Sequence, residues 1–159
     1  MADRHKEERE DLPLTKAAEY LLEECRMVLP GIQALFGFQL VSVFSQRFSQ
    51  ELTRGEQQAH LVAIILIVIA IGLIMTPAAY HREVGGQTVT STFFKVSTKL
   101  LVISMFPLTV ALCIDFYLIA RVIVGGWVAP TLSAAVFVMF ITLWFVLPRW
   151  RRLQKLLSR

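Results

Sequence analysis

The chain has 159 residues, of which 55% are hydrophobic and 18% are charged, and its mean hydropathy is +0.59. Soluble domains carry about a quarter charged residues, so this composition excludes an ordinary soluble domain, a disordered chain and a disulfide scaffold. The net charge of +4 would suggest a nucleic-acid partner in a soluble chain. Here the basic excess lies outside the long apolar stretches, so we expect no nucleic-acid partner.

The N-terminal region precedes the first apolar stretch. Residues 1–12 are strongly charged and predict a disordered tail. In residues 13–28, apolar side chains recur every three or four positions opposite a charged stripe, which predicts an amphipathic helix at the membrane interface that turns at Pro30 and Gly31 into the first span. The alternative is a helix that docks a membrane-protein partner, because its stripe is acidic and anionic lipid favours basic residues.

Four apolar stretches predict transmembrane helices at residues 29–48, 59–80, 100–124 and 127–148. Each has at least the roughly 20 residues that a helix needs to cross a bilayer core about 30 Å thick. Among the chain's 16 basic and 12 acidic residues, these stretches contain only Arg47, Asp115 and Arg121. The predicted fold is therefore all-α, with a four-helix transmembrane domain over residues 29–148.

The connections between the spans carry their own signals. Gly125 and Gly126 predict a tight outer hairpin between the third and fourth spans. For residues 85–98 we expect a break at Gly85-Gly86 followed by an interfacial extension of the third helix, with a re-entrant loop as the alternative. Pro77 and Pro107 lie within spans and predict helix kinks, because proline removes a backbone donor.

The distribution of Lys and Arg predicts the topology. The N-terminal segment, the second connection and the C-terminal tail together contain 13 of these residues, and the opposite side contains three. Since basic residues accumulate in the cytoplasm, both termini are predicted to be cytoplasmic. Residues 149–159 are predicted to be a basic cytoplasmic tail that forms an amphipathic helix, and its membrane-surface contacts to anionic lipid are assigned to Arg149, Arg151, Arg152 and Lys155.

Asp115 is the main candidate for chemistry, because it is an acid placed near mid-membrane. A carboxylate at this depth costs about 2.5 to 3.5 kcal/mol on insertion scales, so Asp115 should face the bundle interior and have a partner or carry a proton. One interpretation is a proton or cation site. The other is an ion pair or hydrogen bond that fixes helix packing, and the sequence leaves both open.

Further polar residues could form a pathway with Asp115. Gln39, Ser42 and Gln46 are spaced by three and four residues and would share one helix face, which favours either interhelical hydrogen bonds or a polar route from mid-membrane to the outside. His60 and Arg121 are placed at the outer mouth of this route. His60 could instead be a plain interfacial histidine, and Arg121 could extend to the outer surface.

Signatures of metal sites and enzymes are missing from the sequence. No Cys or His cluster has metal-ligand spacing, and the predicted depths of Cys25 and Cys113 differ. The chain has no phosphate-binding loop, dinucleotide fingerprint or nucleophile elbow. We therefore expect no metal, no cofactor and no enzymatic activity.

Two segments resemble a known family. The stretch RMVLPGIQALFGF, from Arg26 to Phe38, and MTPAAYHR, from Met75 to Arg82, are similar to those of an uncharacterised bacterial family of small four-span membrane proteins. Some members carry an automatic label of sodium:proton antiporter, although this chain is much shorter than such antiporters and has no inverted repeat. The resemblance implies a protein of the bacterial inner membrane and supplies no site residues.

These observations favour an oligomeric channel or transporter for an ion or proton, with Asp115 as the titrating or cation-attracting site. A homo-oligomer is expected, because four helices alone pack too tightly to leave a pore. The alternative is a non-catalytic accessory or scaffold subunit of a membrane complex, in which buried polar residues only hold helices together.

Overall fold

The computed structural model describes residues 13–83 and 90–150, and the regular structure in these ranges is helical. In chain order, the helices are α1 (Leu14–Val43), α2 (Gln46–Glu51), α3 (Arg54–Glu83), α4 (Ser91–Ile123) and α5 (Val128–Ile141), which continues through a π-helical turn, η1 (Thr142–Val146). Four of them are long and apolar enough to cross a membrane, the last over Val128–Trp150. This confirms the all-α prediction with four spanning helices.

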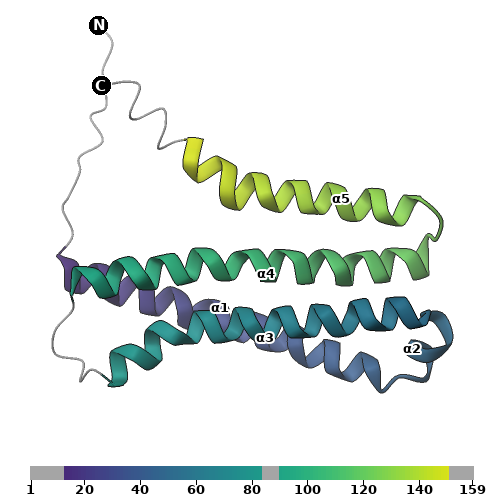
Figure 1. The fold of residues 1–159 in the computed structure, drawn as a ribbon, viewed down its shortest axis with the longest axis horizontal. Coiled ribbons are helices and arrows are strands. Elements are labelled where there is room, and N and C mark those ends of the chain that lie inside the picture. The colour runs from purple at the N-terminus through teal and green to yellow at the C-terminus, as the bar shows by residue number, and fades with distance from the viewer. Residues whose placement is uncertain (1–12, 84–89, 151–159) are drawn as a thin grey trace, which may run out of the picture.

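The long helices lie side by side along one axis (Figure 1). α3 and α4 share the most extensive contact, α1 packs against both, and α5 packs mainly against α4. Small side chains bring α5 close to α4, because Ala129 is fully buried and the Ser133 hydroxyl donates a 2.8 Å hydrogen bond to the Cys113 carbonyl.

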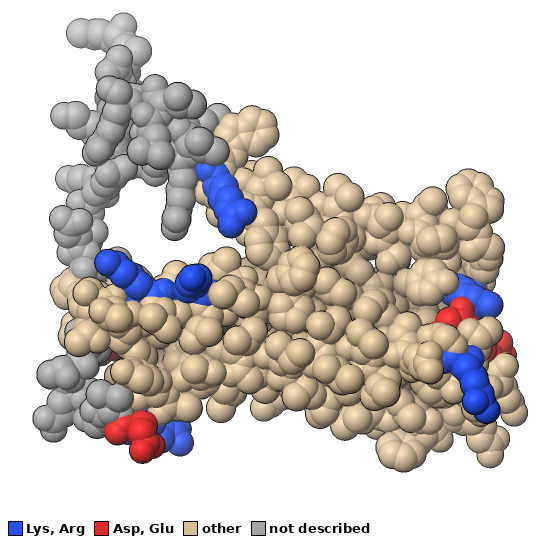
Figure 2. Space-filling model, viewed as in Figure 1, with Lys and Arg blue, Asp and Glu red and all other residues tan. Residues whose placement is uncertain are grey.

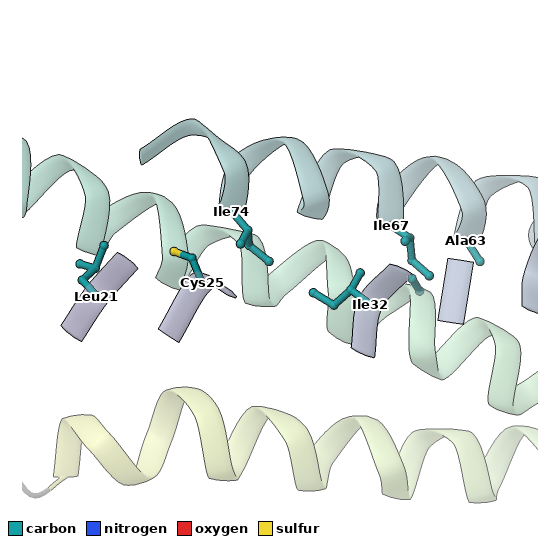
Figure 3. Close-up of a cluster of buried hydrophobic side chains, with 7 residues drawn as sticks. Leu21, Cys25, Ile32, Ala63, Ile67 and Ile74 are labelled. Atoms are coloured by element: carbon teal, nitrogen blue, oxygen red, sulfur yellow. The ribbon is translucent and has the colours of Figure 1, made fainter. Parts of the chain in front are cut away.

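The apolar core lies between α1, α3 and α4. Figure 3 shows side chains from α1 and α3 that meet there. The buried cluster consists of Leu21, Cys25, Ile32, Ala63, Ile67, Ile74 and Ala111. Large apolar side chains also cover the outside of the bundle. On the face in Figure 2, Lys, Arg, Asp and Glu lie toward the two ends, with an uncharged surface between them, as expected for helices in a bilayer.

α1 differs from the expected arrangement of an interfacial helix, a turn and a span. It runs without interruption from Leu14 to Val43 and contains Pro30. The apolar stripe predicted for residues 13–28 packs into the bundle, since Leu21 and Cys25 are buried. Neighbouring helices stabilise the segment, and a membrane helix tolerates proline within it. With 30 residues, α1 is about 45 Å long, so its charged N-terminal part can extend beyond a 30 Å hydrocarbon core.

The C-terminal end of α1 also differs from the expected boundary at residue 48. The helix ends at Val43, Ser45 takes an extended conformation, and a short second helix, α2, follows. Its sequence, QRFSQE, is mostly polar, which explains why this segment leaves the apolar helix and lies across its end. Gln46 is consequently exposed and begins α2.

α4 begins at Ser91, so residues 91–98 continue the third span as a helix. Gly85 and Gly86 lie outside the described residues. Pro77 and Pro107 are buried within α3 and α4, and Figure 1 shows that α3 bends in its C-terminal part, which contains Pro77.

The α4–α5 turn depends on glycine. Gly125 and Gly126 have φ values of +67° and +58°, in the left-handed region where a Cβ is strained. Trp127 follows at the start of α5 and is exposed. At the other end of this span Arg149 is exposed, whereas the tail at residues 1–12 and the predicted lipid-binding residues Arg151, Arg152 and Lys155 lie outside the described residues.

Candidate functional site

Three helices place a cluster of polar side chains inside the bundle. α1 supplies Gln39 and Ser42 from its last two turns, α3 supplies His60 from its second turn, and α4 supplies Asp115. Gln39 and His60 are 4% and 7% exposed, so the cluster is enclosed by neighbouring side chains. Four of the residues considered for a polar pathway therefore meet at one place.

His60 is held by contacts to both ring nitrogens. Nε2 lies 3.1 Å from the Ser42 hydroxyl and 3.2 Å from the Gln39 backbone carbonyl. Nδ1 lies 3.3 Å from Oδ1 of Asp115. The Phe48 ring of α2 packs edge-on against the imidazole, with ring centroids 5.2 Å apart. These contacts fix the ring plane and aim Nδ1 at the carboxyl group.

The hydrogen bonds around His60 indicate which of its ring nitrogens is the donor. The Ser42 hydroxyl donates to the Gln39 carbonyl at 2.7 Å, so its oxygen can only accept from Nε2, as the carbonyl does. With this direction of the hydroxyl bond, Nε2 is the donor to the carbonyl, and Nδ1 faces Oδ1 of Asp115.

The carboxyl oxygens of Asp115 are only partly hydrogen-bonded by their neighbours. The Gln39 amide nitrogen donates to Oδ2, which orients the carboxyl group between α1 and α3. Oδ1 of Asp115 and Oε1 of Gln39 are buried and have no hydrogen-bond partner among the described residues, because the His60 contact lacks hydrogen-bond alignment. Buried acceptors are nearly always paired, so these two oxygens are the groups of the cluster that can accept a further donor.

A cavity of about 500 Å³ adjoins the cluster, between α1, α2 and α4. Gln39, Ser42, His60 and Asp115 contribute to its lining. Its walls are otherwise mainly apolar, and they include Phe38, Ile119 and Ile123, which are 75%, 58% and 75% exposed on the outside of the bundle. The cavity therefore opens among side chains that face the bilayer.

Arg121 does not join this cluster. It forms an ion pair with Glu56 in the first turn of α3. Glu56 also accepts hydrogen bonds of 2.8 Å from the backbone nitrogen and the hydroxyl of Thr53, and Thr53 Oγ1 accepts a 3.4 Å bond from the Glu56 nitrogen. This is the reciprocal capping of a Thr-x-x-Glu sequence, a signal that sequence analysis could have used to find Glu56.

Gln46 also lies apart from the cluster, because α1 ends before it. Phe48, by contrast, contacts His60 without having been singled out. Glu56, the partner of Arg121, was not singled out either. Phe48 had no sequence signal, since its approach to His60 depends on how α2 folds across the end of α1.

The described residues contain no group of three or more His, Cys, Asp or Glu side chains that could hold a metal ion. Cys25 and Cys113 are separate buried thiols. Within the cluster, the His60 imidazole and the Asp115 carboxyl group can each bind a proton, and Gln39 and Ser42 can form hydrogen bonds.

Comparison with known proteins identifies the family of this chain. No curated protein and no solved structure matches the chain. A family model described as "Family of unknown function (DUF6328)" matches residues 6–148, which include all four spanning helices over most of their length. The chain therefore belongs to the DUF6328 family of unknown function.

Proposed function

We propose that this protein is a membrane transporter that takes up and releases a proton at the His60–Asp115 pair. The observation that carries the proposal is the approach of Nδ1 of His60 to Oδ1 of Asp115, at 3.3 Å, inside a bundle of apolar helices. Ionisable groups at such a depth are costly and commonly mark ion or proton pathways.

The pair is suited to exchange because its two protonation states need little rearrangement. We place the exchanged proton on Nδ1, where the imidazolium is ion-paired with Oδ1 of Asp115 at 3.3 Å. After the proton leaves, a neutral imidazole keeps its Nε2 hydrogen bonds while the Gln39 amide continues to donate to the carboxylate. Ser42, through its bond to the Gln39 carbonyl, holds the imidazole in the same orientation in both states.

The surroundings favour a carrier over an open pore. From the cluster toward the C-terminal end of α3, the core side chains are apolar, among them Ile67, Ala70 and Ile74. The hydroxyls of Ser104 and Thr109 in α4 donate to carbonyls of their own helix. Along the described residues, protons therefore lack a continuous polar route through one chain, and transport would require a conformational change or a second copy.

The same proposal includes the setting of the protein. We place it in the bacterial inner membrane with both termini in the cytoplasm, because basic residues predominate on that side. We also propose a homo-oligomer. Thr131 and Ala135 are exposed and four residues apart on α5, a spacing that lets membrane helices approach closely.

The test is a proton flux assay with purified protein in liposomes that contain a pH-sensitive dye. A potassium diffusion potential drives protons, and wild type is compared with Asp115→Asn and with Glu83→Gln, which removes an exposed acid at the end of α3. We expect flux from wild type and Glu83→Gln, and at least a tenfold lower rate from Asp115→Asn. Folded wild type with no flux above empty liposomes would refute transport.

A scaffold subunit is the alternative function, and the exposed charges on the N-terminal part of α1 favour it: Lys16, Glu19, Glu23, Glu24 and Arg26. It predicts that a second membrane protein copurifies in fixed ratio and that charge reversal at Glu19 and Glu23 releases it. Equal proton flux from wild type and Asp115→Asn, together with such a partner, would replace our proposal with this one.

A further inference from the structure

The cavity beside Asp115 has a chemical character that narrows what it can hold. Most of its wall is apolar, formed by side chains such as Phe38, Leu118 and Ile119, whereas Gln39, His60 and Asp115 contact one another and form a buried polar end. A pocket of this kind fits a molecule with a hydrophobic body and one polar group.

The side chains at the polar end determine which charge and which hydrogen-bonding atoms the polar group of the ligand must have. Among the described residues, two buried side-chain atoms lack a hydrogen-bond partner, Oδ1 of Asp115 and Oε1 of Gln39, and both are acceptors. Gln39 is only 4% exposed, so water does not readily donate a hydrogen bond to its Oε1. The group that complements a carboxylate and an amide oxygen is a cation with N–H donors. Because the cavity opens among exposed apolar side chains such as Phe38 and Ile119, a molecule that is soluble in the bilayer can reach it.

We propose that the cavity binds a lipophilic protonated amine, whose ammonium group contacts Asp115 and whose hydrocarbon part lies along α1 and α4. This inference rests on the proposed function, because it names the substrate that the protonated pair would exchange. The ammonium keeps its own protons. As it contacts Asp115, the proton on Nδ1 of His60 leaves to water, so one proton is released for each amine bound.

Charged groups around the pair are consistent with this exchange. α3 presents His60 and, nearer its beginning, Glu56, whose charge is paired with Arg121 of α4. α2 contributes the exposed side chains of Arg47 and Glu51, of opposite charge, to the cavity lining. α1 contributes only uncharged polar groups at the cluster, and α5 has no charged residue. Asp115 is therefore the acid at the polar end of the cavity that is left to pair with a cation.

The test uses full-length protein in phosphatidylcholine nanodiscs and three probes of equal chain length: dodecylammonium, dodecanol and dodecanoate. We expect saturable binding of dodecylammonium, with about one proton released per bound molecule in a weakly buffered dye assay. Asp115→Asn should lower its affinity about tenfold or more, since the buried charge pair is lost, while Glu83→Gln should bind as wild type does. Lower pH should weaken binding, because protons compete for the pair.

A second variant keeps the inference testable if Asp115→Asn folds poorly. Ile119→Trp adds bulk to the cavity wall at a side chain that is 58% exposed, and it should also lower dodecylammonium affinity. Equal binding of all three probes would overturn the inference, because the cavity would then hold any alkyl chain. Proton flux that depends on Asp115, without amine binding, would refute the substrate class and leave the transport proposal intact. Amine binding with proton release but no flux would support the site and refute transport.

Discussion

Glu56 at the beginning of α3 is ion-paired with Arg121, two residues before the last residue of α4. The same carboxylate caps the first turn of α3 through Thr53. One side chain thus stabilises a helix start and joins two helices at the end of the bundle near the α2 connection. Because the Asp115 cavity lies close to this end, the Glu56–Arg121 pair also limits how far α3 and α4 can separate there.

Replacing Glu56 should cost more stability than replacing its partner. Glu56→Ala removes the cap and the ion pair and should lower the free energy of unfolding by about 1 to 2 kcal/mol. Arg121→Gln removes only the ion pair, whose arginine is 39% exposed, and should cost less than about 1 kcal/mol. Denaturation in mixed micelles measures both values. Equal losses from the two variants would show that the cap contributes nothing.

His60 and Asp115 should be energetically coupled. His60→Gln and Asp115→Asn each remove one side of the contact, so the double variant should lose less stability than the two single variants combined, with a coupling energy of about 1 to 2 kcal/mol. Unfolding curves of the four proteins at neutral pH give this energy. Additive losses would mean that the 3.3 Å approach carries no interaction.

Two glycines should respond to alanine in opposite directions. Gly125→Ala places a Cβ at φ +67° and should destabilise the protein by about 1 to 2 kcal/mol. Gly72→Ala lies within α3, where an added Cβ meets no atom within 4 Å, and should stabilise it by about 0.5 to 1 kcal/mol. Thermal unfolding of both variants in the same detergent checks the difference. A stabilising Gly125→Ala would contradict the conformation of the turn.

The proposed topology predicts which side of the membrane thiol reagents reach. Phe44 lies between α1 and α2 and is 87% exposed, so Phe44→Cys should react with a membrane-impermeant maleimide applied outside intact cells. The native Cys25 and Cys113 are buried and should add little background. Arg149→Cys, at the other end of the bundle, should react only after the membrane is opened. The reverse pattern would invert the topology.

The four spanning helices were predictable because each depends on a long local run of apolar residues. The ends of these helices were harder to predict. The expected turn at Pro30 is absent because contacts of Leu21 and Cys25 with other helices hold α1 as one helix. Such contacts are not visible in a local pattern.

The candidate site was predictable only in part. Asp115 and Gln39 stand out as polar groups in apolar segments, and the structure places them in contact. The approach of His60 to Asp115 depends on how α3 is rotated against α4, which one sequence does not specify. The spacing of Gln46 from Ser42 would place it on the polar face of α1 only if the helix continued to residue 46. Because α1 ends at Val43, Gln46 does not lie on that face.

The position of the cavity mouth has a quantitative consequence. Because exposed side chains such as Phe38 and Ile123 border it, a molecule that enters between them dissolves in the bilayer before it occupies the cavity. Occupancy then follows the concentration in the lipid phase. Each methylene group contributes about 0.8 kcal/mol to partitioning, so lengthening a ligand by one carbon should raise its apparent affinity from water about fourfold, even when the contacts at Asp115 stay the same.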